Sequence, residues 1–361
     1  MKNPSFWISL LVAILSSIVL FRFQDIIYDT ITTHSAPILS HLFPITTNTT
    51  TAATSPPTNT TMSLSRAIRK VFLAVEQSEG AGARVRRSIG TPQLRNFSPF
   101  LMLDHFHIAP GAGFPDHPHR GQETITYLIS GGVDHEDFAG NRGTIGPGDL
   151  QFMTAGRGIV HAEMPVQNAD GAENIGLQLW VDLPKALKMV EPRYRDLKAE
   201  EVPVVEKDGV KIKVISGRSQ GVDSVKDLAY TPVWILDVEV KPGRSVVQEL
   251  PEGWNAFGYV LEGEVLVGDK GAQTVVERFH NVVFEQEGQV VKIEVDAGAE
   301  GPGRVVLVAG TPLDQKVVQY GPFVLNSQEE VYQAFEDYQG FKNGFERAKG
   351  WESEIGKTMI R

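Results

Sequence analysis

The feature that most constrains the fold is a run of short β-prone segments, each followed by a turn. From residue 71 to about residue 183, segments such as ETITYLIS and IGLQLWVDLP alternate with clusters of Gly, Pro, Asn and Asp. Turns that recur about every eight to twelve residues are typical of an all-β sandwich or barrel. The composition agrees, because 35 glycines and 21 prolines in 361 residues supply many tight turns.

A second series of the same kind runs from about residue 210 to residue 308. The segment TYLISGGVDHED of the first series has a counterpart in GYVLEGEVLVGD of the second. We therefore predict an internal duplication of one β-barrel. In residues 326–350 apolar residues recur at helical spacing, which predicts a C-terminal helix that docks on a barrel, with Asn326 or Ser327 as its cap.

The first 61 residues differ from the rest of the chain. Residues 6–21, FWISLLVAILSSIVLF, are nearly all apolar. Their length falls between a signal-peptide core of about 7–15 residues and a membrane-spanning helix of about 20. Residues 46–61 are dominated by threonine, which predicts a disordered linker. Membrane or secretory targeting through residues 6–21 and a variable leader without chemistry both remain open.

Charge and cysteine content exclude several classes of function. The formal net charge is −10, with 34 Lys and Arg against 44 Asp and Glu, which argues against direct nucleic-acid binding. The chain has no cysteine, so that disulfides, Cys-based zinc sites and thiol nucleophiles are excluded. Any redox behaviour must therefore come from a bound metal or cofactor.

Two histidines stand one residue apart in FPDHPHRGQE. In a strand, side chains at i and i+2 point to the same face, so His117 and His119 project together. Further along, GRGIVHAEMP places His161 and Glu163 at the same spacing. If the first strand stays regular, Glu123 lies on the same face as its two histidines. Three imidazoles and a carboxylate form a mixed nitrogen and oxygen set, which suits iron, manganese, copper, nickel or zinc better than calcium or magnesium.

The remaining histidines carry weaker signals. His105 and His107 form another H-x-H, but no matching second pair accompanies them. His135 lies in DHED next to a glycine pair, and we interpret it as a turn residue. His280 is the only histidine of the second series, so we predict one metal per chain, held by the first barrel.

The segment FPDHPHRGQETITYLISGGVDHEDFAGNRGTIGPGDLQFMTAGRGIVHAEMP resembles the signature of the pirin family, a branch of the cupin superfamily. The likeness extends from about residue 65 to the C-terminus, including RRSIG and LMLDHF, and leaves out residues 1–61. It implies an all-β bicupin fold, with two tandem jelly-roll barrels and a C-terminal helix. It also implies one iron, Fe(II), bound by His117, His119, His161 and Glu163, with other divalent transition metals as alternatives.

Glu123 has two possible roles under this resemblance. The wider cupin pattern uses a carboxylate at this position as a metal ligand. Pirins use the carboxylate two residues after the third histidine instead, which favours Glu163. Glu123 then becomes a candidate for orienting an imidazole N–H from behind the ligands.

These interpretations divide the chain into five parts. The predicted parts are a hydrophobic segment with a linker (1–61), a metal-binding cupin barrel (62–184), a connection (185–208), a cupin barrel without metal (209–325) and a helix with a tail (326–361).

The resemblance implies two activities. One is a quercetin 2,3-dioxygenase type reaction of a flavonol with O2, in which Glu163 acts as ligand and general base. The other is a nuclear co-regulator whose iron oxidation state alters its grip on a transcription-factor partner, through which any contact with DNA would be made. A structural metal is a third interpretation. We favour the dioxygenase. The family implies nucleus or cytoplasm, whereas a functional segment 6–21 implies a membrane or secretory location.

Overall fold

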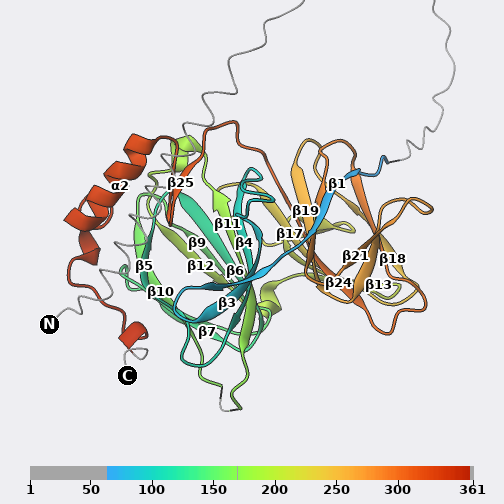
Figure 1. Cartoon of the computed structure of the whole chain (residues 1–361), viewed down its shortest axis with the longest axis horizontal. Coiled ribbons are helices and arrows are strands. Elements are labelled where there is room, and N and C mark those ends of the chain that lie inside the picture. Colours follow the sequence, from blue (N-terminus) through green and yellow to red (C-terminus); the bar gives the residue numbers. More distant parts are fainter. Residues whose placement is uncertain (1–62, 169, 358–361) are drawn as a thin grey trace, which may run out of the picture. The chain divides into compact units, whose positions relative to one another are not determined.

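A computed structural model describes residues 63–168 and 170–357, and Figure 1 shows how their elements are arranged. The predictions for residues 1–61 lie outside this part of the chain. Within the described ranges, none of the helices combines the length and the hydrophobicity that a membrane span requires.

The first jelly roll consists of two antiparallel sheets. Its large sheet has the strand order β12-β9-β6-β11-β4-β3-β2, and its small sheet has the order β5-β10-β7-β8. The large sheet contains β2 (Glu76–Glu79), β3 (Ala83–Ile89), β4 (Phe100–Ile108), β6 (Gln122–Ser130), β9 (Leu150–Thr154), β11 (Asn174–Asp182) and β12 (Arg193–Leu197). The small sheet contains β5 (Phe114–His119), β7 (Val133–Asp137), β8 (Arg142–Ile145) and β10 (Ile159–Pro165).

The second jelly roll repeats this arrangement strand for strand. Its sheets have the orders β1-β22-β19-β24-β17-β14-β13 and β18-β23-β20-β21, which confirms the predicted duplication, with open jelly-roll sheets rather than closed barrels. The large sheet contains β1 (Ile68–Leu73), β13 (Val204–Lys207), β14 (Val210–Ser216), β17 (Val233–Val240), β19 (Asn255–Glu262), β22 (His280–Phe284) and β24 (Gly303–Gly310). The small sheet contains β18 (Ser245–Glu249), β20 (Glu264–Val267), β21 (Thr274–Glu277) and β23 (Val290–Glu294).

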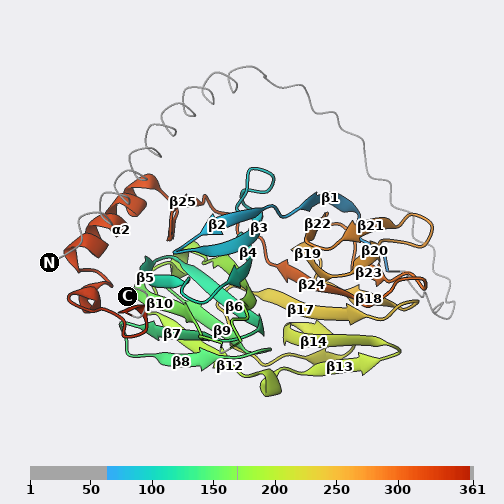
Figure 2. The same cartoon turned by 60° about the horizontal axis from the view of Figure 1, so that its bottom comes forward.

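One apolar cluster joins the two jelly rolls, which lie side by side in Figure 2. Alternate residues of each large sheet point away from that sheet's own small sheet and toward the other jelly roll. Burying one such leucine or phenylalanine contributes about 1.5–3 kcal/mol. The buried members include Leu103, Ile125, Tyr127 and Phe152 from the first jelly roll, and Ile235, Phe257, Tyr259 and Val306 from the second.

Polar contacts cross the same interface. The hydroxyl of Tyr127 on β6 donates to Oδ2 of Asp237 on β17 at 2.7 Å. Within the second jelly roll, Arg304 on β24 binds both oxygens of Asp237 at 2.8 Å. The ammonium group of Lys213 donates to the Tyr127 hydroxyl at 3.0 Å. A buried carboxylate is stable here because each of its oxygens accepts charged or polar donors.

The chain crosses between the jelly rolls at places that the predicted boundaries do not follow. Strand β1, inside the predicted first barrel, pairs with β22 of the second jelly roll. Strand β12, inside the predicted connection, pairs with β9 of the first. Both are edge strands of their large sheets, and an added strand satisfies backbone groups that an open edge would leave unpaired.

The predicted C-terminal helix is α2 (Gln328–Gly340), and it follows the hairpin of β25 (Val318–Tyr320) and β26 (Phe323–Leu325). The Ser327 side chain accepts a hydrogen bond from the backbone N–H of Glu330 at 3.2 Å, which confirms serine rather than asparagine as the cap. Val331 and Ala334 join an apolar cluster with Val160 of β10. The helix therefore docks on the first jelly roll.

Candidate metal centre

Three histidines meet on the inner face of the small sheet of the first jelly roll. His117 and His119 occupy positions i and i+2 of β5, so their side chains share one face of the strand. His161 on β10 is the cross-strand partner of His117. The ring centroids of the three imidazoles lie 4.4–5.0 Å apart. One nitrogen from each ring falls within 4.8 Å of the other two. The spacing of two residues within each strand therefore brings these three predicted ligands together.

The nitrogen atoms are arranged as a metal ion requires. Nδ1 of His117 lies 2.9 Å from the carbonyl oxygen of Pro115. This contact holds the proton on Nδ1 and leaves the lone pair on Nε2. Nε2 of His117 lies 3.0 Å from Nε2 of His161, and the buried Nε2 of His119 has no hydrogen-bond partner among the described residues. Nitrogen donors that converge on one point in this way fit a transition metal.

The protonation states agree with this fit. Burial lowers the pKa of His119 and His161 well below the usual value for histidine, and the neighbouring imidazole of His117 lowers both further. These two imidazoles are therefore neutral at physiological pH. A neutral imidazole has the lone pair that a metal ion needs.

Gln122 orients His119 from behind. Its side-chain amide lies 2.7 Å from Nδ1 of His119 and also donates to the carbonyl oxygen of Pro322 at 3.4 Å. Oε1 of Gln122 is buried and has no hydrogen-bond partner in the part of the chain that the structure describes. With a metal on Nε2, His119 would keep its proton on Nδ1, and the Gln122 amide would present its oxygen to that N–H.

Glu163 lies beside the histidine cluster. Its Oε2 atom is 4.0 Å from Nε2 of His161. Thr126 donates to Oε1 at 3.1 Å and Gln178 donates to Oε2 at 3.3 Å. Burial raises the pKa of Glu163, although the imidazole of His117 and these two hydrogen bonds oppose the rise. The structure thus places a buried carboxylate next to the cluster, and its role as a fourth ligand stays a prediction.

Glu123 has no hydrogen bond to an imidazole among the described residues, and the structure thereby corrects its predicted role of orienting one. Its Oε1 accepts hydrogen bonds from the Thr154 hydroxyl at 2.7 Å and from the Tyr230 backbone at 2.9 Å. Its Oε2 accepts one from the Thr231 backbone at 3.0 Å. The expectation that Glu123 lies on the same face as His117 and His119 assumed a regular strand. However, β5 ends at residue 119, and Gly121, at φ +78°, turns the chain into β6. Glu123 therefore anchors the second jelly roll to the first.

His135 lies in strand β7 and is buried, which corrects its interpretation as a turn residue. It is the cross-strand partner of Glu163, so both side chains share the inner face of the sheet. Its Nε2 lies 3.1 Å from Oδ2 of Asp196. The charged pattern DHED resembles a turn, but its alternate residues, His135 and Asp137, are buried.

The large sheet presents a row of polar side chains to the histidines. Strand register places Gln178, Thr126 and Gln151 side by side, and the bonds to Glu163 show that the row faces the small sheet. Both amide atoms of Gln151 are buried, with no hydrogen-bond partner in the described part of the chain. Each buried group left unpaired costs about 1–3 kcal/mol, so water or a ligand is expected to satisfy this amide.

The next row adds two aromatic side chains. The indole of Trp180 stands edge-on to His119, with ring centroids 5.2 Å apart. Tyr194 stacks against His135 at 5.0 Å. The indole N–H and the phenol hydroxyl are both buried and lack a partner among residues 63–168 and 170–357. The sequence signal for the side chains that face the histidines was the presence of polar residues within the otherwise apolar segment IGLQLWVDLP.

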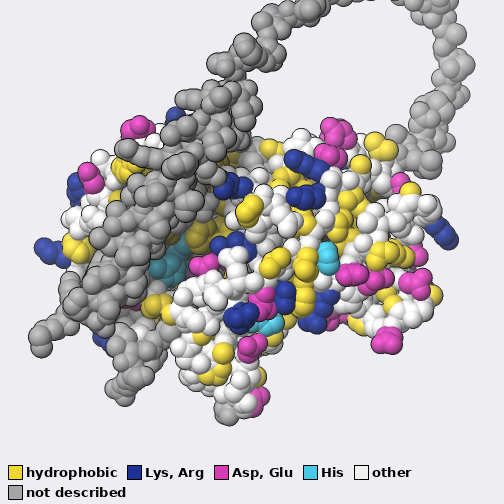
Figure 3. Space-filling model, viewed as in Figure 1, with side chains coloured by type: hydrophobic (Ala, Val, Ile, Leu, Met, Phe, Trp, Pro, Cys, Tyr) yellow, Lys and Arg dark blue, Asp and Glu magenta, His cyan; other side chains and the backbone are white. Residues whose placement is uncertain are grey.

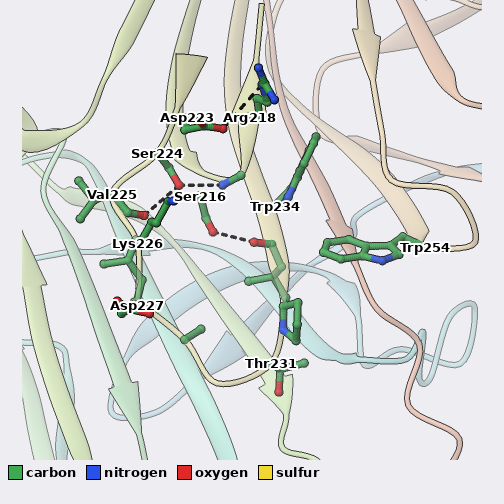
Figure 4. Close-up of a pocket in the computed structure, with 15 residues that line it drawn as sticks. Ser216, Arg218, Asp223, Ser224, Val225, Lys226, Asp227, Thr231, Trp234 and Trp254 are labelled. Atoms are coloured by element: carbon green, nitrogen blue, oxygen red, sulfur yellow. Dashed lines mark hydrogen bonds and ion pairs between the residues drawn. The ribbon is translucent and has the colours of Figure 1, made fainter. Parts of the chain in front are cut away.

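The second jelly roll carries a cavity of another kind, shown in Figure 4. Its volume is about 400 Å³, and Trp234, Trp254, Arg218, Asp223 and Lys226 are among its lining residues. The two indoles meet edge to face, with centroids 6.2 Å apart. None of the lining residues is a histidine, so the cavity has no imidazole ligands for a metal.

The surface agrees with the acidic composition. On the face that Figure 3 shows, acidic and basic side chains are interspersed, without one large basic patch. This face therefore lacks the clustered positive charge that a nucleic-acid groove requires.

Comparison with known proteins assigns the fold and the family. The family model Pirin matches residues 82–181, and the model Pirin C-terminal cupin domain matches residues 235–344. Pirin of Homo sapiens is 51% identical over 294 residues, which cover 80% of this chain and 98% of the human protein. The chain belongs to the pirin family. The two jelly rolls of this pirin-family chain are its two cupin domains.

Solved structures share the fold of this pirin-family chain. A quercetin 2,3-dioxygenase from Acinetobacter baumannii superposes with a TM-score of 0.70 at 29% identity, covering 78% of this chain and 99% of that one. A bacterial pirin from Escherichia coli, YhhW, in complex with nickel(II), superposes with a TM-score of 0.51 at 21% identity, covering 68% and 100%. The second likeness is evidence of the fold alone.

Proposed function

We propose that this chain binds one transition-metal ion through His117, His119 and His161, with Glu163 as the fourth ligand, and acts as a dioxygenase of the quercetin 2,3-dioxygenase type. The observation that carries the proposal is the convergence of three imidazole nitrogens beside a buried carboxylate. The likeness to the Acinetobacter enzyme supports the reaction class. Fe(II) is the proposed metal, and this donor set also accepts manganese, copper, nickel or zinc.

The proposed reaction opens the central ring of a flavonol. One flavonol and one O2 give one ring-opened ester and one carbon monoxide, so that both atoms of O2 enter the ester. When bound, the metal supplies a Lewis acid that favours the deprotonated form of the flavonol 3-hydroxyl group. The reaction consumes no external reductant, which suits a chain without cysteine.

Glu163 accepts the proton of the 3-hydroxyl group in this proposal. Burial raises its pKa, which makes the carboxylate a stronger base than an exposed glutamate. Thr126 and Gln178 hold the carboxylate toward His161. The unpaired amide of Gln151 faces the same space, and it offers both a donor and an acceptor to the hydroxyl groups of a polyphenol.

The test uses the full chain, loaded with Fe(II) under anaerobic conditions. We expect one iron per chain, equal consumption of oxygen and quercetin, and release of carbon monoxide. Glu163→Gln should abolish turnover. His161→Ala should lose the metal while the fold remains intact, because it removes one of three nitrogen donors. A fully metallated His161→Ala protein would disprove the ligand assignment. Iron binding without turnover would favour the iron-dependent co-regulator over the enzyme.

A further inference from the structure

The small sheet that carries the histidines is covered on its outer face by residues 318–357. Figure 1 and Figure 2 both show α2 and the C-terminal tail beside β5 and β10. Strand alternation turns the neighbours of the histidines outward, away from the cluster. These neighbours are Asp116, Arg120 and Val160, and each of them contacts the C-terminal segment.

Arg120 is the central contact. It follows His119 directly, and its side chain is 2% exposed, as is that of its partner Asp337. Its guanidinium donates to Oδ2 of Asp337 on α2 at 2.8 Å, to the carbonyl oxygen of Asn343 at 2.6 Å and to that of Arg157 at 2.6 Å. The aromatic ring of Phe345 lies 4.8 Å from the guanidinium carbon. One side chain thus ties the end of β5 to the helix and to the tail.

The start of β5 is held in the same way. The carboxylate of Asp116, next to His117, accepts hydrogen bonds from the hydroxyl of Ser353 and, at 3.1 Å, from its backbone N–H. On β7, the carboxylate of Glu136 accepts one from the backbone N–H of Glu354 at 2.9 Å. The tail therefore grips the outer face of the sheet at several separate points.

Strand β5 needs this support because it is the edge strand of its sheet. Among the described strands it pairs with β10 alone, and the pairing shifts register between His161 and Glu163. Edge strands with irregular pairing open more readily than central strands. At the turn into β6, the space beside Gly121 is filled by the carbonyl oxygen of Val324, which leaves no room for a side chain. The C-terminal segment thus takes the place of a second neighbouring strand.

We propose that the C-terminal segment, residues 318–357, positions His117 and His119 through Asp116 and Arg120, so that metal affinity and docking of the segment are coupled. The inference rests on the metal binding of the proposed function. Coupling is reciprocal: a segment that holds the ligands in place tightens metal binding, and a bound metal strengthens the docking of the segment by the same factor. Arg120 and Asp337 are then positioning residues that do not touch the metal.

The test compares Co(II) affinity in three full-length proteins: wild type, Asp337→Asn and Tyr127→Phe. Asp337→Asn removes the charge that faces Arg120. We expect its Co(II) dissociation constant to rise by about 10-fold to 100-fold, the effect of losing a group that orients metal ligands. Tyr127→Phe weakens the interface between the jelly rolls, on the face of the large sheet that is turned away from the histidines, and controls for general destabilisation. We expect a change below about twofold there. Asp337→Glu keeps the charge and should restore part of the affinity.

Two further readouts separate positioning from simple stability. The visible spectrum of bound Co(II) should differ between wild type and Asp337→Asn, because it reports the arrangement of the ligands. Amide exchange in residues 341–357 should slow when Co(II) binds to the wild type. If Asp337→Asn does not fold, Ser353→Ala tests the second anchor, and its Co(II) affinity should also fall.

The outcomes are distinct. A wild-type protein that binds no Co(II) would overturn the metal site of the proposed function, and this inference with it. A wild type that binds Co(II), with unchanged affinity in the folded variant and metal-independent exchange of the tail, would overturn this inference alone.

Discussion

Replacing Glu123 by glutamine distinguishes a structural role of its carboxylate from a role in metal binding. Glu123 is 2% exposed and accepts three hydrogen bonds, two on Oε1 and one on Oε2. Two of the donors, the backbone N–H groups of Tyr230 and Thr231, belong to the loop before β17 of the second jelly roll. Glutamine fills the same volume, so that the effect isolates the charge and one acceptor atom.

The magnitude follows from these bonds. In the better orientation, the glutamine oxygen keeps the two donors of Oε1, and its NH2 group faces the Thr231 N–H. One hydrogen bond to a charged group is lost, at about 1.5–3 kcal/mol, and a buried N–H is left unpaired. The two remaining bonds lose their charge assistance, which roughly halves their strength. We expect the free energy of unfolding to fall by about 2–4 kcal/mol.

Equilibrium urea unfolding followed by tryptophan fluorescence measures this change, and metal content is measured in parallel. The exposed Glu252 is the matched control, and Glu252→Gln should change stability by less than about 0.5 kcal/mol. Metal binding should stay at the wild-type level in both variants. A Glu123→Gln protein with unchanged stability and no bound metal would refute the structural role of Glu123. That result would instead indicate that Glu123 is a metal ligand.

Two further predictions concern the interface between the jelly rolls. Tyr127→Phe removes the hydroxyl that donates to Asp237 at 2.7 Å. The free energy of unfolding should fall by about 1.5–3 kcal/mol in the same urea assay. A change below about 0.5 kcal/mol would contradict this prediction. Burial, together with the positive charges around it, lowers the pKa of His105 from 6.5 to about 3. Between pH 6.5 and about pH 3, the unfolded chain therefore binds a proton at His105 that the native protein does not bind. Stability should therefore fall by about 1.4 kcal/mol per unit as the pH drops through this window. His105→Gln should flatten that slope, and a slope equal to that of the wild type would show that other groups cause it.

The three histidines were predictable because their convergence depends mainly on strand geometry. Alternation places His117 and His119 on one face, and antiparallel pairing brings His161 opposite. Glu123 was misplaced by the same rule, because the rule fails where Gly121 interrupts the strand. A positive φ angle at Gly121 changes the face to which the side chains of the following residues point. The pattern of apolar and polar residues gives no sign of this change.

The other site residues depend on contacts between distant parts of the chain. Gln122 contacts His119 only because the chain turns back on itself between β5 and β6. Asp337 meets Arg120 across 217 positions. The helical period predicted α2 and its cap from nearby residues alone, but it carried no information about which jelly roll the helix would cover. Partners at such separations follow from the tertiary fold and not from local pattern.

The docking of residues 318–357 on the sheet that carries the histidines has a consequence for biosynthesis. His117, His119 and His161 leave the ribosome before residues 318–357, the segment that backs their sheet. At about 5–20 residues per second, its synthesis is complete roughly 10–40 s after that of His161. During this interval the nascent chain carries the imidazoles without the outer layer that fixes them. Tight metal capture is therefore expected only after residues 318–357 have been made and have docked on the sheet.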